Sequence, residues 1–268
     1  MMNWKQLISA KRFGMEEFHE ERQENRSEFQ RDYDRLIFSA PFRRLQNKTQ
    51  VFPLPGSVFV HNRLTHSLEV ASVGRSLGDD VAKALLERHP ELQDSFLPEI
   101  GSIVSAACLA HDLGNPPFGH SGEKAISTFF SEGKGVRLKE KQPNGEQLSP
   151  MEWEDLIHFE GNANAFRILT HQFEGRRKGG FVLTYTTLAS IVKYPFSSSL
   201  AGTKSKFGFF VSEEESFRKI ATELGLILLN EHPLKYARHP LVYLVEAADD
   251  ICYQMMDIED AYKLKILT

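Results

Sequence analysis

A histidine and an aspartate stand side by side at the end of an apolar stretch. Residues 99–112 read EIGSIVSAACLAHD and are almost uniformly apolar until His111 and Asp112. Burying an unpaired charge is strongly unfavourable, and a divalent metal ion would satisfy both groups. An imidazole with a carboxylate suits transition metals and, with waters, Mn or Mg. The alternative is a His–Asp hydrogen bond that caps a helix, and the dipeptide alone favours it because short motifs often match by chance.

Two distant residues could complete a metal site around this pair. His66 lies near an expected helix start in HNRLTHSLEV. Asp249, with Asp250 as the neighbouring candidate, interrupts the apolar residues of LVYLVEAADDICYQMMDIED. Two histidines and two carboxylates would leave coordination positions for water and phosphate. An open site of this kind can acidify a bound water near neutral pH.

A second pair of side chains could move protons. His120 and Glu123 are three residues apart at an expected helix N-terminus, so they can share one face of the helix. The free N–H groups of such a terminus attract anions. A phosphate held there would meet a histidine able to donate or accept a proton, with the glutamate setting its tautomer. The alternative is that Glu123 only interacts with the helix dipole and His120 is a loop residue.

The composition is ordinary for a soluble globular protein. Hydrophobic residues make up 41% and charged residues 25% of the 268 residues. The two cysteines, Cys108 and Cys252, lie in apolar helical patterns and suggest no disulfide framework. The formal net charge of -4 argues against wholesale nucleic-acid binding. The net charge does not exclude a local basic cluster. Such a cluster is formed by Arg43, Arg44, Lys48 and Arg63.

No segment of the sequence predicts contact with a membrane. No window approaches the roughly 20 apolar residues that a membrane span needs. The first residues, MMNWKQLISAKRFG, lack the apolar core of a signal peptide. We therefore expect a cytoplasmic protein.

The elements that must position these residues are mostly helices, because apolar residues recur with helical periodicity. A cap at Thr65 is expected for one of them. Residues 195–208 read as a loop, and Asn144-Gly145 is a turn signal for a small β-hairpin within 133–150, with a mobile loop as the alternative. The sequence predicts a mainly α fold in one domain, with helices over 15–38, 65–88, 99–112, 121–130, 151–172, 186–193, 213–230 and 240–263.

Six sequence blocks together resemble a known family. They run in the family's order from about Arg35 to Lys263, and they read RRLQNKTQVF, HNRLTHSLEVA, AHDLGNPPFGHSGE, FEGNANAFRIL, LTYTTLASIVKYP and EAADDICYQMMDIED. These blocks are similar to the motifs of the deoxyguanosine triphosphate triphosphohydrolases, which belong to the HD superfamily. The resemblance implies a helical bundle of the HD type in a single domain over 1–268. In that arrangement N-terminal helices within 1–60 pack on an HD core over 61–268.

The resemblance implies a reaction and the residues that carry it. A deoxynucleoside triphosphate (dNTP), either dGTP or several dNTPs, is cleaved at the α-phosphate to give a deoxynucleoside and tripolyphosphate. A divalent metal, Mn or Mg first and Fe, Co, Ni or Zn next, would provide the attacking water. His120 and Glu123 match the pair beside the α-phosphate, with His120 as proton donor to the leaving 5′-oxygen or, with roles exchanged, as base. The metal ligands by motif position are His66, His111, Asp112 and Asp249.

Four further residues match the family's substrate contacts by position. Gln50 would lie at the deoxyribose, where a close fit disfavours a 2′-hydroxyl, and Lys193 would contact a phosphate. Tyr253 and Asp257 follow Asp249 at helical spacing, so they would share its helix face. The resemblance implies that Tyr253 would stack on the sugar and that Asp257 would bond its 3′-hydroxyl. The alternative for each is a core or surface role, and for Tyr253 it is helix packing.

The sequence departs from the family's pattern in three places. Position 115 is Asn and position 161 is Gly where many relatives have His. The chain also lacks the usual C-terminal part, which contributes to base recognition and assembly in the family. It is expected to be either a fragment or a minimal member. The resemblance further implies a homo-oligomer, often a hexamer.

Two other functions remain open on the sequence alone. One is another phosphohydrolase of the HD superfamily, such as a 5′-nucleotidase or a phosphodiesterase. The other is a nucleotide-sensing module, or one that binds single-stranded nucleic acid weakly, with little turnover. The basic cluster of Arg43, Arg44, Lys48 and Arg63 favours the module, whereas an intact set of metal ligands favours an enzyme.

Overall fold

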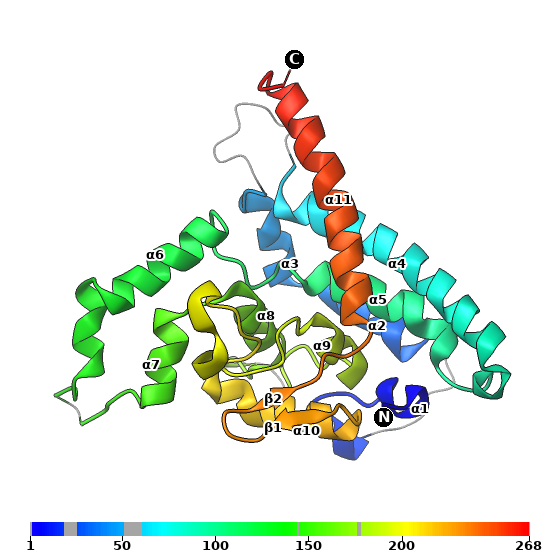
Figure 1. Cartoon of the computed structure of the whole chain (residues 1–268), viewed down its shortest axis with the longest axis horizontal. Helices are drawn as coiled ribbons and strands as arrows, with labels where there is room; N and C mark the ends of the chain where they lie inside the picture. The colour runs from blue at the N-terminus through cyan, green and yellow to red at the C-terminus, as the bar shows by residue number, and fades with distance from the viewer. Residues whose placement is uncertain (1, 19–25, 51–60, 144, 176–177, 268) are drawn as a thin grey trace.

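The protein is built almost entirely of helices (Figure 1). The computed structural model describes residues 2–18, 26–50, 61–143, 145–175 and 178–267. The predicted mainly α fold is confirmed. Short 3-10 helices join the α-helices, which are α1 (Trp4–Leu7), α2 (Glu28–Ile37), α3 (Ala40–Arg44), α4 (Arg63–Arg88), α5 (Ile100–Ala110), α6 (His120–Ser131), α7 (Pro150–Ile157), α8 (Gly161–Thr170), α9 (Tyr185–Ile191), α10 (Glu214–Glu223) and α11 (Val242–Lys263). The strands β1 (Leu228–Asn230) and β2 (Lys235–Tyr236) pair antiparallel.

Helix α5 forms the centre of the core. Every residue from Ile100 to Ala110 is buried, as expected for a helix that is apolar on all sides. It packs against α2, α4, α9 and α11. Gly78 of α4 meets Gly101 of α5 so closely that a Cβ on Gly78 would lie 2.7 Å from the Gly101 Cα. The small residues therefore let α4 and α5 lie nearly backbone to backbone.

Helix α11 crosses α4 and also contacts α5 and α9 (Figure 1). Its inward face buries Ala248, Cys252 and Met256 in the main core. Near its end, both carboxylate oxygens of Asp260 bind His61, just before α4: Oδ2 accepts the backbone N–H at 2.9 Å and Oδ1 lies 2.8 Å from Nδ1. This contact fixes the far half of α11 against the start of α4.

The N-terminal segment is tied to the same core by a buried ion pair. Arg12 lies 2.7 Å from Asp32 Oδ1, and it also donates to the backbone oxygen of Val182 at 2.7 Å. The second oxygen of Asp32 accepts from the N–H and hydroxyl of Thr184. Side chains of the first 60 residues, Leu7, Phe29 and Leu36 among them, belong to the main hydrophobic cluster.

Several predicted boundaries hold to within a few residues, but the cap of α4 is not Thr65. Asn62 is the N-cap, and its side chain accepts from the N–H groups of Leu64 and Thr65 at 3.0 Å each. Thr65 stands at the third helical position, where its hydroxyl accepts the N–H of Asn62 at 3.2 Å. The two residues thus form a reciprocal capping box, with the N-cap three residues earlier than predicted.

The predicted helices over 15–38 and 151–172 are each shorter than expected. In the first, α2 begins only at Glu28, and residues 19–25 lie outside the described part of the chain. The second is divided into α7 and α8. The break occurs because the side chain of Glu160 turns back to accept the N–H groups of Asn162 and Ala163, which starts a new helix.

The prediction of a β-hairpin within 133–150 is wrong. Residues Lys134–Lys139 form a 3-10 helix, and no strand is found in the described residues of this segment, which do not include Asn144. The hairpin lies instead at β1 and β2, partly inside the predicted helix over 213–230. That helix stops early because Gly225 adopts a φ of 65°, a left-handed conformation that glycine favours.

Candidate metal centre

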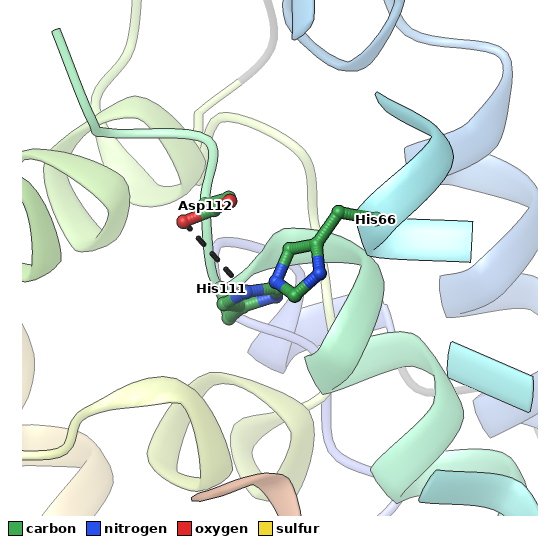
Figure 2. A group of neighbouring side chains, drawn as sticks. All are labelled: His66, His111 and Asp112. Atoms are coloured by element: carbon green, nitrogen blue, oxygen red, sulfur yellow. Dashed lines mark ion pairs between the residues drawn. The ribbon is translucent and has the colours of Figure 1, made fainter. Parts of the chain in front are cut away.

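Three helices bring the four predicted metal ligands to one place. His66 lies in the first turn of α4, His111 and Asp112 directly follow α5, and Asp249 lies in α11. Figure 2 shows the imidazoles of His66 and His111 beside Asp112; the ring centroids are 5.3 Å apart and the rings are steeply inclined. Asp249 Oδ1 lies 2.9 Å from His66 Nε2 and 3.7 Å from His111 Nε2. The carboxylate of Asp249 therefore lies beside both histidines, although the side chains whose ligand atoms all lie within 4.8 Å of one another are His66, His111 and Asp112.

The donor set fits a divalent metal ion. One ligand atom from each of His66, His111 and Asp112 lies within 4.8 Å of the others. The Nδ1–H of His111 donates to the backbone oxygen of Cys108 at 2.6 Å, which points Nε2 towards the carboxylates. This Nε2 is buried and makes no hydrogen bond to any residue that the structure describes. A buried imidazole nitrogen that accepts no hydrogen bond is typical of a metal ligand in the absence of its ion.

The charges around these ligands favour ionised carboxylates. Burial by itself raises the pKa of Asp249, but the charge of His111 and the hydrogen bond from His66 lower that pKa to about 2. Burial likewise opposes ionisation of Asp112, yet His111 and Arg63 lower its pKa overall. Burial lowers the pKa of His111, whereas the neighbouring Asp112 and Asp249 raise it overall. The site thus collects negative charge that a cation would neutralise.

Arg63 and Asn115 hold Asp112 in place. Arg63 NH1 lies 2.8 Å from Asp112 Oδ2, and the amide of Asn115 donates to Asp112 Oδ1. Arg63 is buried in this role. Lys48 donates to the backbone oxygen of Leu113 at 3.2 Å. The basic cluster predicted from the sequence is therefore divided, because Arg63 and Lys48 face the site while Arg43 and Arg44 are exposed on α3.

The two departures from the family's pattern lie against each other. A Cβ placed on Gly161 would be 2.1 Å from Asn115 Oδ1 and 2.9 Å from Glu123 Oε1. The backbone N–H of Gly161 also donates to Glu123 Oε1 at 2.8 Å. A side chain at position 161 would displace the amide that holds Asp112. The glycine at position 161 therefore leaves the space that the side chain of Asn115 occupies.

The predicted pairing of His120 with Glu123 is present. Both lie in the first turn of α6, and His120 Nδ1 is 2.7 Å from Glu123 Oε2. The imidazole is largely exposed, whereas the carboxylate is almost buried. An ionised Glu123 accepts the Nδ1 proton, which leaves Nε2 as the ring nitrogen available to a substrate.

The metal ligands and the His120–Glu123 pair line one cleft of about 510 Å³. Of the predicted substrate contacts, Gln50, Lys193 and Tyr253 also line it. Asp257 does not line this cleft; it hydrogen-bonds to Tyr253 one turn further along α11. Lys193 Nζ lies 2.9 Å from Glu246 Oε1.

The cleft contains charged and polar residues that the sequence did not single out. Lys206 Nζ lies 2.8 Å from Glu160 Oε1, and Glu160 is fully buried. Tyr194 and Asn162 also line the cleft. No local signal marks Lys206, because it lies within the segment 195–208 that was predicted as a loop and meets its partners only through the fold.

The comparisons with known proteins agree with this geometry. A family model described as HD domain matches residues 63–177, which include three of the four ligands. The chain is 45% identical over 275 residues to a deoxyguanosinetriphosphate triphosphohydrolase-like protein of Synechocystis, covering 99% of this chain and 61% of that protein. A protein of the same description from Pseudomonas aeruginosa is 46% identical over 274 residues, with coverages of 99% and 58%. A deoxyguanosinetriphosphate triphosphohydrolase of Yersinia enterocolitica is 36% identical over 301 residues, with coverages of 100% and 56%.

The fold and site therefore define an HD-domain protein. Within that class, the chain is similar over nearly its whole length to deoxyguanosinetriphosphate triphosphohydrolase-like proteins. It spans about three fifths of the length of the curated relatives named above. In the described residues, no helix is both long and apolar enough to cross a membrane.

Proposed function

We propose that the protein is a metal-dependent phosphohydrolase that converts a dNTP to a deoxynucleoside and tripolyphosphate. The observation that carries this proposal is the shared cleft, which His111 lines together with the His120–Glu123 pair. The Nε2 of His111 is buried and makes no hydrogen bond to any described residue. A metal site alone would suit many functions. A metal site beside an exposed imidazole that a carboxylate orients suits hydrolysis with protonation of a leaving group. The names of the relatives support dGTP as one substrate.

The residues can be given roles in this reaction. A divalent ion held by His66, His111, Asp112 and Asp249 would supply positive charge that acidifies water and polarises the α-phosphate. The oxygen of water forms a bond to the α-phosphorus and gives up a proton to the solvent, while the bond to the 5′-oxygen breaks. His120, held through Nδ1 by Glu123, gives its Nε2 proton to the departing 5′-oxygen. The reverse assignment, with His120 as base, uses the same geometry.

The remaining predicted contacts are assigned to parts of the substrate. The Lys193 ammonium provides positive charge for the phosphates. Gln50, whose Oε1 is buried without a hydrogen bond to the described residues, is available to a deoxyribose hydroxyl. Tyr253 is half exposed at the cleft, where its ring can stack on the sugar. Asp257 lies outside the cleft lining and hydrogen-bonds to Tyr253, so we assign it to holding that ring and not to the 3′-hydroxyl.

Product analysis tests the proposal. The chain is incubated with each dNTP and with Mn, Mg, Fe, Co, Ni or Zn in turn, and the products are separated by anion exchange. Deoxynucleoside and tripolyphosphate in equal amounts are expected. Orthophosphate or a nucleoside monophosphate would instead indicate a phosphatase or phosphodiesterase. Nucleotide binding without hydrolysis in every metal would indicate a sensing module.

We also propose that the chain is a single domain that forms a homo-oligomer. Residues from the first 60 positions share one hydrophobic cluster with the rest of the chain, which supports the single domain. The outer face of α11 exposes four apolar side chains at intervals of four, three and four residues, which is the spacing of a helix-pairing seam. They are Ile251, Met255, Ile258 and Tyr262. Sedimentation velocity would show whether the chain assembles.

A further inference from the structure

Two buried carboxylates share one ammonium group at the edge of the cleft. Glu160 is fully buried and Glu123 is 8% exposed. The Nζ of Lys206 lies 2.8 Å from Glu160 Oε1 and 3.7 Å from Glu123 Oε2. All three side chains line the cleft that contains His120. Lys206 is thus placed between a carboxylate that binds it directly and one that holds the imidazole.

Glu160 is fixed in position by the start of α8. Its Oε2 accepts the N–H of Asn162 at 2.6 Å and that of Ala163 at 3.2 Å. Its Oε1 accepts from the Asn162 amide at 2.7 Å as well as from Lys206. Burial raises the pKa of Glu160, and the Lys206 charge opposes that shift. Four hydrogen bonds, one of them from Lys206, thus fix both oxygens of the Glu160 side chain.

Glu123 makes a different set of contacts. Its Oε1 accepts the N–H of Gly161 at 2.8 Å, and its Oε2 lies 2.7 Å from His120 Nδ1. The same Oε2 is the atom nearest to Lys206. A carboxylate oxygen can accept two hydrogen bonds, but an ammonium that closed on this oxygen would neutralise its charge and so weaken its bond to the imidazole N–H. Because Glu160 holds the ammonium at 2.8 Å, Glu123 is left to His120.

We propose that Glu160 is a positioning residue for the proton-transfer pair. By holding Lys206, it prevents the ammonium from closing on Glu123, and Glu123 then orients the imidazole of His120. The consequence for turnover rests on the phosphohydrolase function proposed above. The orientation of the imidazole does not, because it can be observed in the protein without substrate.

The orientation is measured by ¹H–¹⁵N NMR of the histidine side chains, at a pH where the imidazoles are neutral. His120 is assigned with a His120→Gln variant. In the wild type, its ring is expected mainly as the tautomer protonated on Nδ1. In Glu160→Gln the uncharged amide releases Lys206 to Glu123, and the population should move towards the tautomer protonated on Nε2. A His120 tautomer unchanged in Glu160→Gln would overturn the proposal.

Two further variants make this measurement specific. Glu154→Gln makes the same chemical change on α7, at a residue that pairs with His158 at 3.3 Å, and should leave His120 unchanged. Glu160→Asp keeps an acidic cap for α8 but withdraws the carboxylate from Lys206. It should shift the tautomer as Glu160→Gln does, and it decides the question if Glu160→Gln does not fold. A shift in Glu154→Gln as large as that in Glu160→Gln would contradict the proposal.

Turnover gives an independent readout. Glu160→Gln should lower kcat about tenfold with KM nearly unchanged, because the loss affects proton transfer and not binding. In a Glu123→Gln background the same substitution should have no further effect, since the path through Glu123 is already absent. Effects that multiply in the double variant, or a raised KM with an unchanged kcat, would contradict the positioning role. A wild-type chain that hydrolyses no dNTP would contradict the proposed function, and the NMR result would still decide the role of Glu160.

Discussion

At the scale of single residues, His111 differs from the simpler interpretation of its sequence, in which it and Asp112 cap a helix by bonding to each other. Its Nδ1–H caps the end of α5 by donating to the oxygen of Cys108, and its Nε2 lies 3.6 Å from Asp112 Oδ1. This Nε2 is buried near two carboxylates and lacks a hydrogen bond within the described part of the chain. The cap orients the ring, and the free nitrogen is then available as a metal ligand.

Substitutions should separate metal binding from proton transfer. Asp112→Ala removes a carboxylate ligand and should abolish both metal content and turnover. His120→Ala should lower turnover by about 10²- to 10⁴-fold, the usual contribution of a general acid or base, while the metal stays bound. Metal content by atomic emission and kcat measured on the same samples check this. A metal-free His120→Ala protein would contradict the division of roles.

Local spacing was enough to predict some of the site but not all of it. His120 and Glu123 are one helical turn apart, so their pairing follows from the helix alone. His66 and Asp249 were found only through their motifs, since their contact joins α4 to α11. Glu160 lies in the block FEGNANAFRIL but was given no role there, and Lys206 lies in none of the six blocks. The contact between them depends on how α8 begins and on a loop whose course the sequence does not specify.

At the scale of elements, the far half of α11 depends on its contact with His61. Asp260→Ala removes both hydrogen bonds to His61, and the free energy of unfolding should fall by about 1–3 kcal/mol. Amide hydrogen exchange at the end of α11 should become faster. Glu259→Ala is the matched control, because that exposed residue pairs only with Lys263 on the same helix among the described residues. Equal losses in the two variants would show that the contact with His61 has no special role.

Element boundaries were harder to predict than the elements themselves. Helix periodicity located α4, α5 and α11 because their apolar faces are long. The division between α7 and α8 was missed, because apolar residues continue through it and only the capping side chain of Glu160 marks the break. The hairpin was misplaced for a similar reason. Asn144-Gly145 is a good turn signal, but Lys134–Lys139 form a 3-10 helix and the other described residues of 133–150 form no strand.

At the scale of the whole molecule, one buried histidine should make stability depend on pH. His239 is fully buried, with Nε2 donating to the oxygen of Leu7 at 3.1 Å and Nδ1 accepting the N–H of Leu241 at 3.2 Å. Burial lowers its pKa to about 4. The unfolded chain has the ordinary value of about 6.5, so it binds this proton first as the pH falls. The stability is therefore complete above pH 6.5 and is lost between there and pH 4.

Urea unfolding at pH 7 and pH 5 measures this effect. The wild type should lose about 2 kcal/mol of unfolding free energy from His239 over that interval. His239→Gln has no imidazole to protonate, so its loss over the same interval should be smaller by that amount. Identical pH dependence in the two proteins would show that His239 is not held neutral by the fold. The contact matters to the whole molecule because it joins the segment before α11 to α1.

The central claim is that water attacks the α-phosphorus of a dNTP and releases intact tripolyphosphate. It is tested most directly by turnover of dGTP in ¹⁸O-labelled water, followed by mass spectrometry of both products. The account predicts unlabelled deoxyguanosine and tripolyphosphate that carries one ¹⁸O, with neither product formed by Asp112→Ala. Label in orthophosphate, label in the nucleoside, or a nucleoside monophosphate among the products would contradict it.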